Sequence, residues 1–72
     1  MAANGRPRAL VTRRELQVAQ LAADGLQNGD IAEHIGCKEQ TVRHHTRNLC
    51  GKIGAKTRAH MVAILFRKGY LQ

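Results

Sequence analysis

Helical spacing divides residues 40–53 into two sides of unlike chemistry. One side, at positions i, i+3, i+7 and i+11, holds Val42, His45, Leu49 and Ile53. The other side holds Gln40, Arg43, His44 and Arg47. The first side predicts contact with a core, whereas the second carries two fixed positive charges and no acid. Arginine forks match the acceptors of guanine and an amide matches adenine, so the second side suits the major groove of DNA. The alternative is an ordinary basic side in contact with solvent.

A first helix is predicted to begin after Thr12. The segment Thr12-Arg13-Arg14-Glu15 has the pattern of a capping box, in which the first and fourth side chains accept hydrogen bonds from each other's backbone N–H groups. Gly25 is expected to end the helix as a left-handed residue. The apolar stripe between these points includes Val18, Ala19, Ala22 and Leu26.

A short second helix is predicted to follow, with Asn28 as its N-cap and Asp30 in its first turn. Its inward side holds Ile31, Ala32 and Ile35. The turn Gly36-Cys37-Lys38 then leads into the basic helix, at about residues 39–53, which Gly54 ends. Two helices joined by a short turn with glycine have the helix-turn-helix layout. This context favours DNA as the partner of the basic side.

The last predicted helix runs from its N-cap, Thr57, to about Lys68. One stripe of this helix, formed by Met61, Ile64 and Leu65, can pack on the core of the same chain. Further apolar or small residues lie on its other sides, where a short chain has little protein to cover them. A second copy of the chain is the simplest cover, because two-fold pairing is the commonest assembly. The predicted dimer interface is therefore Ala59, Val62, Ala63 and Phe66.

The charge of the 72-residue chain is concentrated in its second half. Residues 1–39 hold five basic and five acidic residues, whereas residues 40–72 hold seven basic residues and no acid. This asymmetry predicts a polyanionic partner. Apart from the histidines, the aromatic residues of the chain are Phe66 and Tyr70. Two such residues are too few to stack the bases of a single strand or to anchor an amphipathic face in a membrane. Double-stranded DNA is the favoured partner.

The length predicts one small domain, over residues 10–72, after a flexible basic arm at residues 1–9. No apolar run reaches the roughly 18 residues of a membrane span, and no secretory signal pattern is present. Two cysteines, Cys37 and Cys50, do not make a disulfide framework. We therefore expect a cytoplasmic protein that does not bind membranes.

With these elements placed, the chain resembles the LuxR/GerE-type helix-turn-helix domain of bacterial transcription regulators. The resemblance covers about residues 10–72, and its motifs occur in order at the spacing of the family. They are Val11-Thr12-x-Arg14-Glu15, Ala23-x-Gly25-Leu26-x-Asn28-x-Asp30-Ile31-Ala32, Thr41-Val42-Arg43-x-His45-x-x-Asn48-Leu49-x-x-Lys52-Ile53-Gly54, and Arg58. The resemblance implies an all-α fold of four helices, with the third in the major groove and the fourth pairing two subunits.

The same resemblance implies roles for single residues. The base-reading positions fall on Arg43, His44 and Arg47, beside Gln40 from the outward side of the helix. Phosphate contacts are expected from Asn28, Thr41, Lys52 and Arg58. Lys38 stands where the family has a Ser or Thr cap, so a side-chain cap is lost and a phosphate contact is gained. The family domain usually follows a receiver or ligand-binding domain, and this chain resembles the stand-alone GerE subtype, without regulation by phosphorylation or a small molecule.

Other functions fit the sequence less well. His34, Cys37, His45 and Cys50 form no recognised zinc motif, and His45 fits a packed core histidine better than a ligand. The acids are scattered and serine is absent, so we expect no enzyme, metal, cofactor or small-molecule ligand. An architectural DNA binder would carry apolar wedges. The main alternative is a protein-interaction module on the same fold, such as an anti-activator. RNA polymerase is a further candidate partner.

Overall fold

The computed structural model describes residues 10–72, so the predicted arm at residues 1–9 lies outside the described residues. The described residues form four helices joined by short turns, as predicted, and contain no strand. The helices are α1 (Arg13–Ala23), α2 (Asn28–Ile35), α3 (Glu39–Ile53) and α4 (Arg58–Arg67).

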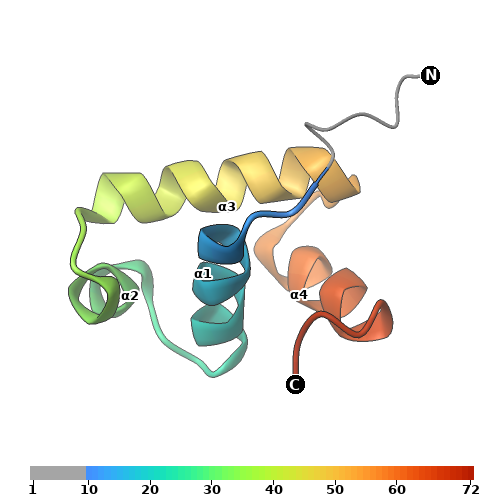
Figure 1. Cartoon of the computed structure of the whole chain (residues 1–72), viewed down its shortest axis with the longest axis horizontal. Helices are drawn as coiled ribbons and strands as arrows, with labels where there is room; N and C mark the ends of the chain where they lie inside the picture. The colour runs from blue at the N-terminus through green and yellow to red at the C-terminus, as the bar shows by residue number, and fades with distance from the viewer. Residues whose placement is uncertain (1–9) are drawn as a thin grey trace.

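The long helix α3 lies across the other three helices (Figure 1). It contacts all of them, and α1 also contacts both α2 and α4. In contrast, α2 and α4 lie on opposite sides of α1 and make no contact through their backbones (Figure 1). One long side of α3 is therefore turned away from the rest of the fold.

The core consists of two clusters of buried side chains on the two sides of α1. Neighbouring residues of α1 belong to different clusters, Val18 to one and Ala19 to the other. In α3, likewise, Val42 belongs to the first cluster and Leu49 to the second. The remaining buried members are Ile31 and Ala32 beside Val18, and Met61, Leu65 and Leu71 beside Ala19. These clusters hold α3 at both ends, which fixes the orientation of its opposite side.

The helix ends follow local signals that the sequence carries. The Thr12 hydroxyl accepts the Glu15 N–H at 3.1 Å, and the Glu15 carboxylate accepts the Thr12 N–H at 2.9 Å, so the capping box is confirmed. Thr57 caps α4 by accepting the His60 N–H at 3.0 Å. Gly54 ends α3 at a φ of 74°, which is the left-handed conformation that glycine adopts without a Cβ clash.

The start of α2 differs from the prediction by one residue. Its N-cap is Gln27, with no side-chain cap, and Asn28 is the first helical residue. The Asn28 side chain instead accepts a hydrogen bond from the Arg58 guanidinium, which also donates to the Leu26 carbonyl at 3.0 Å. The expectation that Asn28 caps the helix was wrong, because its amide oxygen is used in a contact between elements that are distant in sequence.

Candidate nucleic-acid interface

The two-sided nature of α3 is confirmed by burial. Val42 is fully buried and Leu49 is 1% exposed, while His45 is half-buried. The opposite side is exposed at each of the predicted base-reading positions, Gln40, Arg43, His44 and Arg47. The buried side packs on α1, α2 and α4, so the exposed side chains are held on a well-supported helix.

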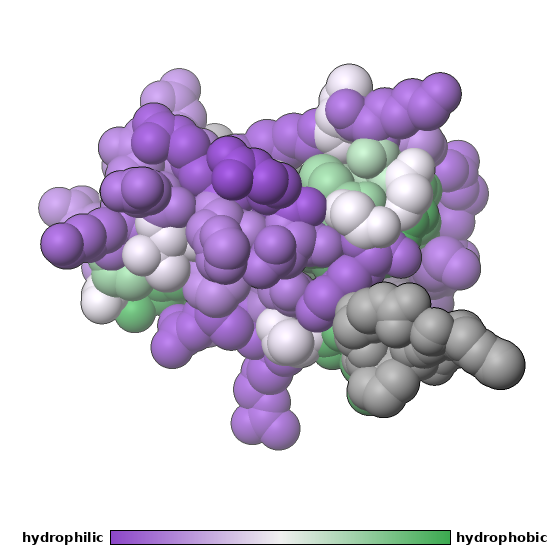
Figure 2. All heavy atoms as spheres, turned by 90° about the horizontal axis from the view of Figure 1, so that it is seen from above, coloured by the Kyte–Doolittle hydropathy of each residue, from purple (hydrophilic) through white to green (hydrophobic). Residues whose placement is uncertain are grey.

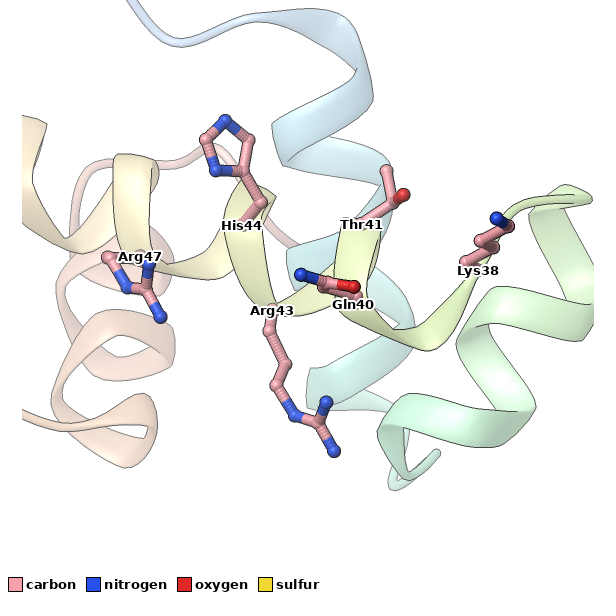
Figure 3. Close-up of a pocket in the computed structure, with 6 residues that line it drawn as sticks. All are labelled: Lys38, Gln40, Thr41, Arg43, His44 and Arg47. Carbon is pink, nitrogen blue, oxygen red and sulfur yellow. The ribbon is translucent and has the colours of Figure 1, made fainter.

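The exposed side of α3 is also hollowed near its first turns. Six side chains line this hollow, all from α3 or the residue before it: Lys38, Gln40, Thr41, Arg43, His44 and Arg47. Figure 3 shows His44 and Thr41 pointing to one edge of the helix and Arg43 pointing to the other, with Gln40 between them. The face of the molecule that carries α3 is mostly hydrophilic (Figure 2). The surface therefore offers donors and positive charge in a concave, polar setting.

Some of these side chains form hydrogen bonds within α3, and others form none. Arg43 Nη2 lies 2.9 Å from Glu39 Oε2, in an ion pair whose side chains are 56% and 49% exposed. His44 Nε2 lies 3.2 Å from Asn48 Nδ2. The Arg47 side chain makes no ion pair or hydrogen bond within residues 10–72, and Gln40 makes none with its amide. The Arg43–Glu39 and His44–Asn48 contacts are exposed, and exposed contacts of this kind are weak enough to be exchanged for contacts with a ligand.

The predicted phosphate contacts fall into three groups in space. Lys38 and Thr41 share the hollow with the base-reading candidates. Asn28 and Arg58 hydrogen-bond to each other and line a second hollow, beside the start of α2. The Lys52 ammonium group is already bonded within the chain. Its Nζ lies 2.8 and 2.9 Å from the two Glu15 carboxylate oxygens and 2.8 Å from the Leu10 carbonyl oxygen. The structure therefore gives Lys52 an internal partner instead of an outward position.

The predicted dimer residues are split between exposed and packed positions. Ala59, Ala63 and Phe66 are exposed, with Phe66 at 45%. Val62 is half-buried and packs against the cluster that contains Met61 and Leu65. Val62 thus belongs partly to the core of its own chain, while the other three leave an uncovered strip on α4. Tyr70, 48% exposed, lies just beyond the end of this helix.

Glu39 was missed by the sequence analysis, which treated the outward side as acid-free from Gln40 onward. Glu39 is the first residue of α3 and lies one turn before Arg43. Opposite charges at i and i+4 on a helix are known to pair, so the spacing was a usable signal. Glu39 also lines the second hollow with Asn28 and Arg58.

Neither the cysteines nor the acids of the described region are grouped as metal ligands. Within residues 10–72, no three His, Cys, Asp or Glu residues are placed to hold a metal ion. Both cysteines are free and half-buried, and burial raises the pKa of the Cys50 thiol. Among the helices of residues 10–72, none has the length and apolar character to cross a membrane.

Comparisons with known proteins agree with this geometry. The family model for bacterial regulatory proteins of the luxR family matches residues 9–65. A solved structure of the transcription factor GerE superposes with a TM-score of 0.83 at 33% identity, covering 89% of this chain and 94% of that one. The LuxR-type fold of four helices is thereby confirmed.

Curated relatives include proteins of very different length. The chain is 37% identical to the transcriptional activator protein VanR of Vibrio anguillarum over 68 residues, or 94% of this chain and 28% of VanR. It is 36% identical to the spore germination protein GerE of Bacillus subtilis over 63 residues, or 88% of this chain and 85% of GerE. The chain thus spans less than a third of the length of VanR but most of GerE. From the family match and these identities, the chain belongs to the luxR family of bacterial regulatory proteins.

Proposed function

We propose that this protein regulates transcription by binding specific sequences of double-stranded DNA, with α3 in the major groove. The observation that carries the proposal is the exposed side of α3, where Lys38, Arg43 and Arg47 surround a polar hollow. A major groove about 12 Å wide admits an α-helix, and its base edges present acceptors to such donors. VanR is a transcriptional activator protein and GerE a transcription factor, and both relatives support the same conclusion.

In this proposal the base edges are read by four side chains of α3. Arg43 and Arg47 lie one turn apart and each can donate two hydrogen bonds to a guanine. Gln40 can pair with an adenine through its amide, and His44 lies on the neighbouring edge of the same hollow. Arg47 and Gln40 are the most available of these groups, because neither side chain has a hydrogen-bond partner to give up within the described residues.

Phosphate contacts would position α3 without reading sequence. Lys38 and Thr41 are suited to this role at the start of α3, and Asn28 with Arg58 at the start of α2. Lys52 is left out of the proposed surface, because three oxygen atoms of its own chain already surround its ammonium group.

The proposed active form on DNA is a homodimer through α4. Its support is the uncovered strip of Ala59, Ala63 and Phe66, where two small side chains would let a second helix approach closely. A two-fold dimer would place two copies of α3 in successive major grooves, so the binding site should be an inverted repeat with half-sites about 10 base pairs apart.

The test is selection of bound sites from random duplex DNA, followed by titration of the selected site and a scrambled duplex over a range of salt. A shared inverted repeat and a steep decrease of log K with log salt concentration are expected, because each neutralised phosphate contributes about 0.9 to the slope. Selection without any enriched sequence would contradict the proposal. If duplex DNA is not bound at all, the protein-interaction module becomes the better description.

A further inference from the structure

Glu39 lies at the boundary between the neutral and the basic half of the sequence. It is the last acidic residue in the sequence, so α3 and α4 contain no other acid. It is also exposed at the start of α3, in the first turn, where a negative charge is favoured by the helix dipole. Glu39 is therefore the one carboxylate on the two basic helices, and it repels anions that approach the start of α3.

The carboxylate of Glu39 lies between the two groups of proposed DNA contacts. On one side, its Oε2 pairs with Arg43 Nη2 at 2.9 Å. On the other side, its Oε1 lies 3.7 Å from the position that a Cβ atom would take at Gly29, and the residue lines the hollow that contains Asn28 and Arg58. Glu39 therefore adjoins both a base-reading candidate and two phosphate candidates.

A base edge and a phosphate respond differently to this carboxylate. The guanidinium has five N–H donors, so Arg43 can keep one hydrogen bond to Glu39 and still donate two to a guanine. A guanine edge carries no net charge and tolerates the neighbouring acid. A phosphate bound by the same arginine would carry a negative charge close to Glu39 and would be repelled by it.

We propose that Glu39 is a specificity-determining residue, which holds the Arg43 guanidinium for a base edge and opposes its use on a phosphate. The inference rests on the proposed function, since it needs a DNA site that Arg43 reads. The proposal can be measured as the ratio of affinities for the preferred site and for random DNA. Glu39 should raise this ratio, because it should lower affinity for random DNA more than affinity for the preferred site.

The test compares Glu39→Gln with a matched control, Glu33→Gln. Both substitutions remove one exposed carboxylate, but Glu33 lies on α2 and makes no ion pair within residues 10–72. Each variant is titrated with the selected duplex, with duplexes altered at single base pairs, and with a scrambled duplex, over a range of salt. Circular dichroism checks that both variants keep the wild-type helicity.

Glu39→Gln is expected to raise affinity for the scrambled duplex by up to about five-fold beyond the control, the factor that corresponds to an exposed ion pair. Its salt slope on that duplex should steepen by about 0.9, as Arg43 gains a phosphate. The ratio of affinities for the selected duplex and for a duplex altered at one base pair should fall, and it should fall at the base pair where Arg43→Ala also lowers this ratio. In an Arg43→Ala background, Glu39→Gln should change affinity for all duplexes by one common factor and leave the preference for the selected duplex unchanged, since no guanidinium remains to be held.

The proposal is overturned if Glu39→Gln and Glu33→Gln change affinity for all duplexes by the same factor. It is also overturned if the loss of discrimination persists in the Arg43→Ala background. These outcomes differ from failure of the proposed function, in which the wild-type protein itself shows no preference for any duplex sequence.

Discussion

Glu15 is the buried charged side chain of the described residues, at 3% exposure. Burial raises the pKa of its carboxyl, but hydrogen bonds from Lys52 and Thr12 and the charge of Lys52 lower it by more, so this pKa lies below its ordinary value. A carboxyl with a lowered pKa in the folded state contributes stability above its unfolded pKa, about 4.3, and loses it as the pH falls through the folded value. The pair with Lys52 therefore contributes to stability at neutral pH.

The first prediction concerns this pair. Glu15→Gln should lower the free energy of unfolding by about 3 kcal/mol at pH 7, because it leaves a largely buried ammonium group without its charge partner. The difference from wild type should begin to shrink as the pH falls below about 4.3, the unfolded pKa, and should keep shrinking as the pH falls through the lower folded pKa, where the wild-type carboxyl also becomes protonated. Urea titrations at pH 7 and pH 3 measure both effects. Glu33→Gln is the control and should change stability by less than about 0.5 kcal/mol at either pH.

The second prediction concerns base reading by Arg47. Arg47→Ala should weaken binding to the selected site by about 1–3 kcal/mol and relax the preference at one base pair per half-site. Stability should change by less than about 0.5 kcal/mol, since this side chain is exposed and makes no hydrogen bond or ion pair within the described residues. Arg67→Ala, an exposed arginine at the end of α4, is the control and should leave base preference intact. Equal weakening by Arg47→Ala on selected and scrambled duplexes would assign Arg47 to a phosphate.

Single-residue roles were predictable only where they depend on local pattern. The outward side of α3 follows from helical periodicity, so the exposure of Arg43 and Arg47 was predicted correctly. The resemblance to the family predicts a phosphate contact for Lys52, which no observation here tests, but the spacing of the motif does not reveal that Glu15, 37 positions earlier, lies against Lys52. Its partner became visible only when α1 and α3 were brought together by the two core clusters.

At the scale of the elements, helix boundaries were predicted within a residue because caps and glycines act locally. Thr12, Thr57 and Gly54 each carry their own signal, and each lies where expected. The start of α2 shifted because Asn28 hydrogen-bonds to Arg58, a contact over 30 positions that no local pattern shows. This contact also ties α4 to α2, whose backbones do not otherwise meet.

The third prediction uses two glycines near the end of α3. Gly51 lies inside the helix, and a Cβ atom added there would meet nothing within 4 Å. Gly51→Ala should therefore stabilise the fold by about 0.5–1 kcal/mol, by reducing the freedom of the unfolded chain. Gly54→Ala should destabilise it by about 1–2 kcal/mol, because its φ of 74° is strained for a residue with a side chain. Thermal unfolding of both variants makes the comparison.

The Gly51→Ala variant also tests how close DNA comes to α3. If Gly51→Ala stabilises the fold but weakens binding to all duplexes, the backbone at Gly51 approaches DNA closely. If binding is unchanged, the glycine is merely tolerated on the exposed side. A loss of stability in Gly51→Ala would contradict the open space that surrounds this position.

At the scale of the whole molecule, charge and fold are arranged together. The neutral half of the sequence forms α1 and α2, which supply much of the core beneath α3, and the basic half forms α3 and α4. The concentration of charge was predictable from the sequence, and so was the fold class, because three amphipathic helical stretches and one more widely apolar helix, joined by short turns, allow few all-α arrangements. The separation of α2 from α4 by α1 was not predictable, since periodicity identifies an apolar side but not its partner.

The uncovered strip on α4 leads to the last prediction. A helix in a chain of this size has few neighbours, and α4 covers its inner side with Met61 and Leu65 but leaves Phe66 exposed beside Ala59 and Ala63. Val62 packs on the core of its own chain, so a charge there would disturb folding as well as pairing. Phe66 is therefore the cleaner probe of a dimer.

Phe66→Glu should reduce affinity for a complete inverted repeat by about ten-fold or more, which corresponds to about 1.4 kcal/mol, and should leave affinity for an isolated half-site nearly unchanged. The reason is that a buried carboxylate on each copy opposes pairing, whereas a half-site needs one copy alone. Gln17→Glu, on the exposed side of α1, adds the same charge and should affect both duplexes equally. Sedimentation of each variant on both duplexes counts the bound copies. Equal losses on the two duplexes, with a lowered melting temperature, would assign Phe66 to the core of the single chain and leave the inverted repeat to be explained by DNA contacts alone.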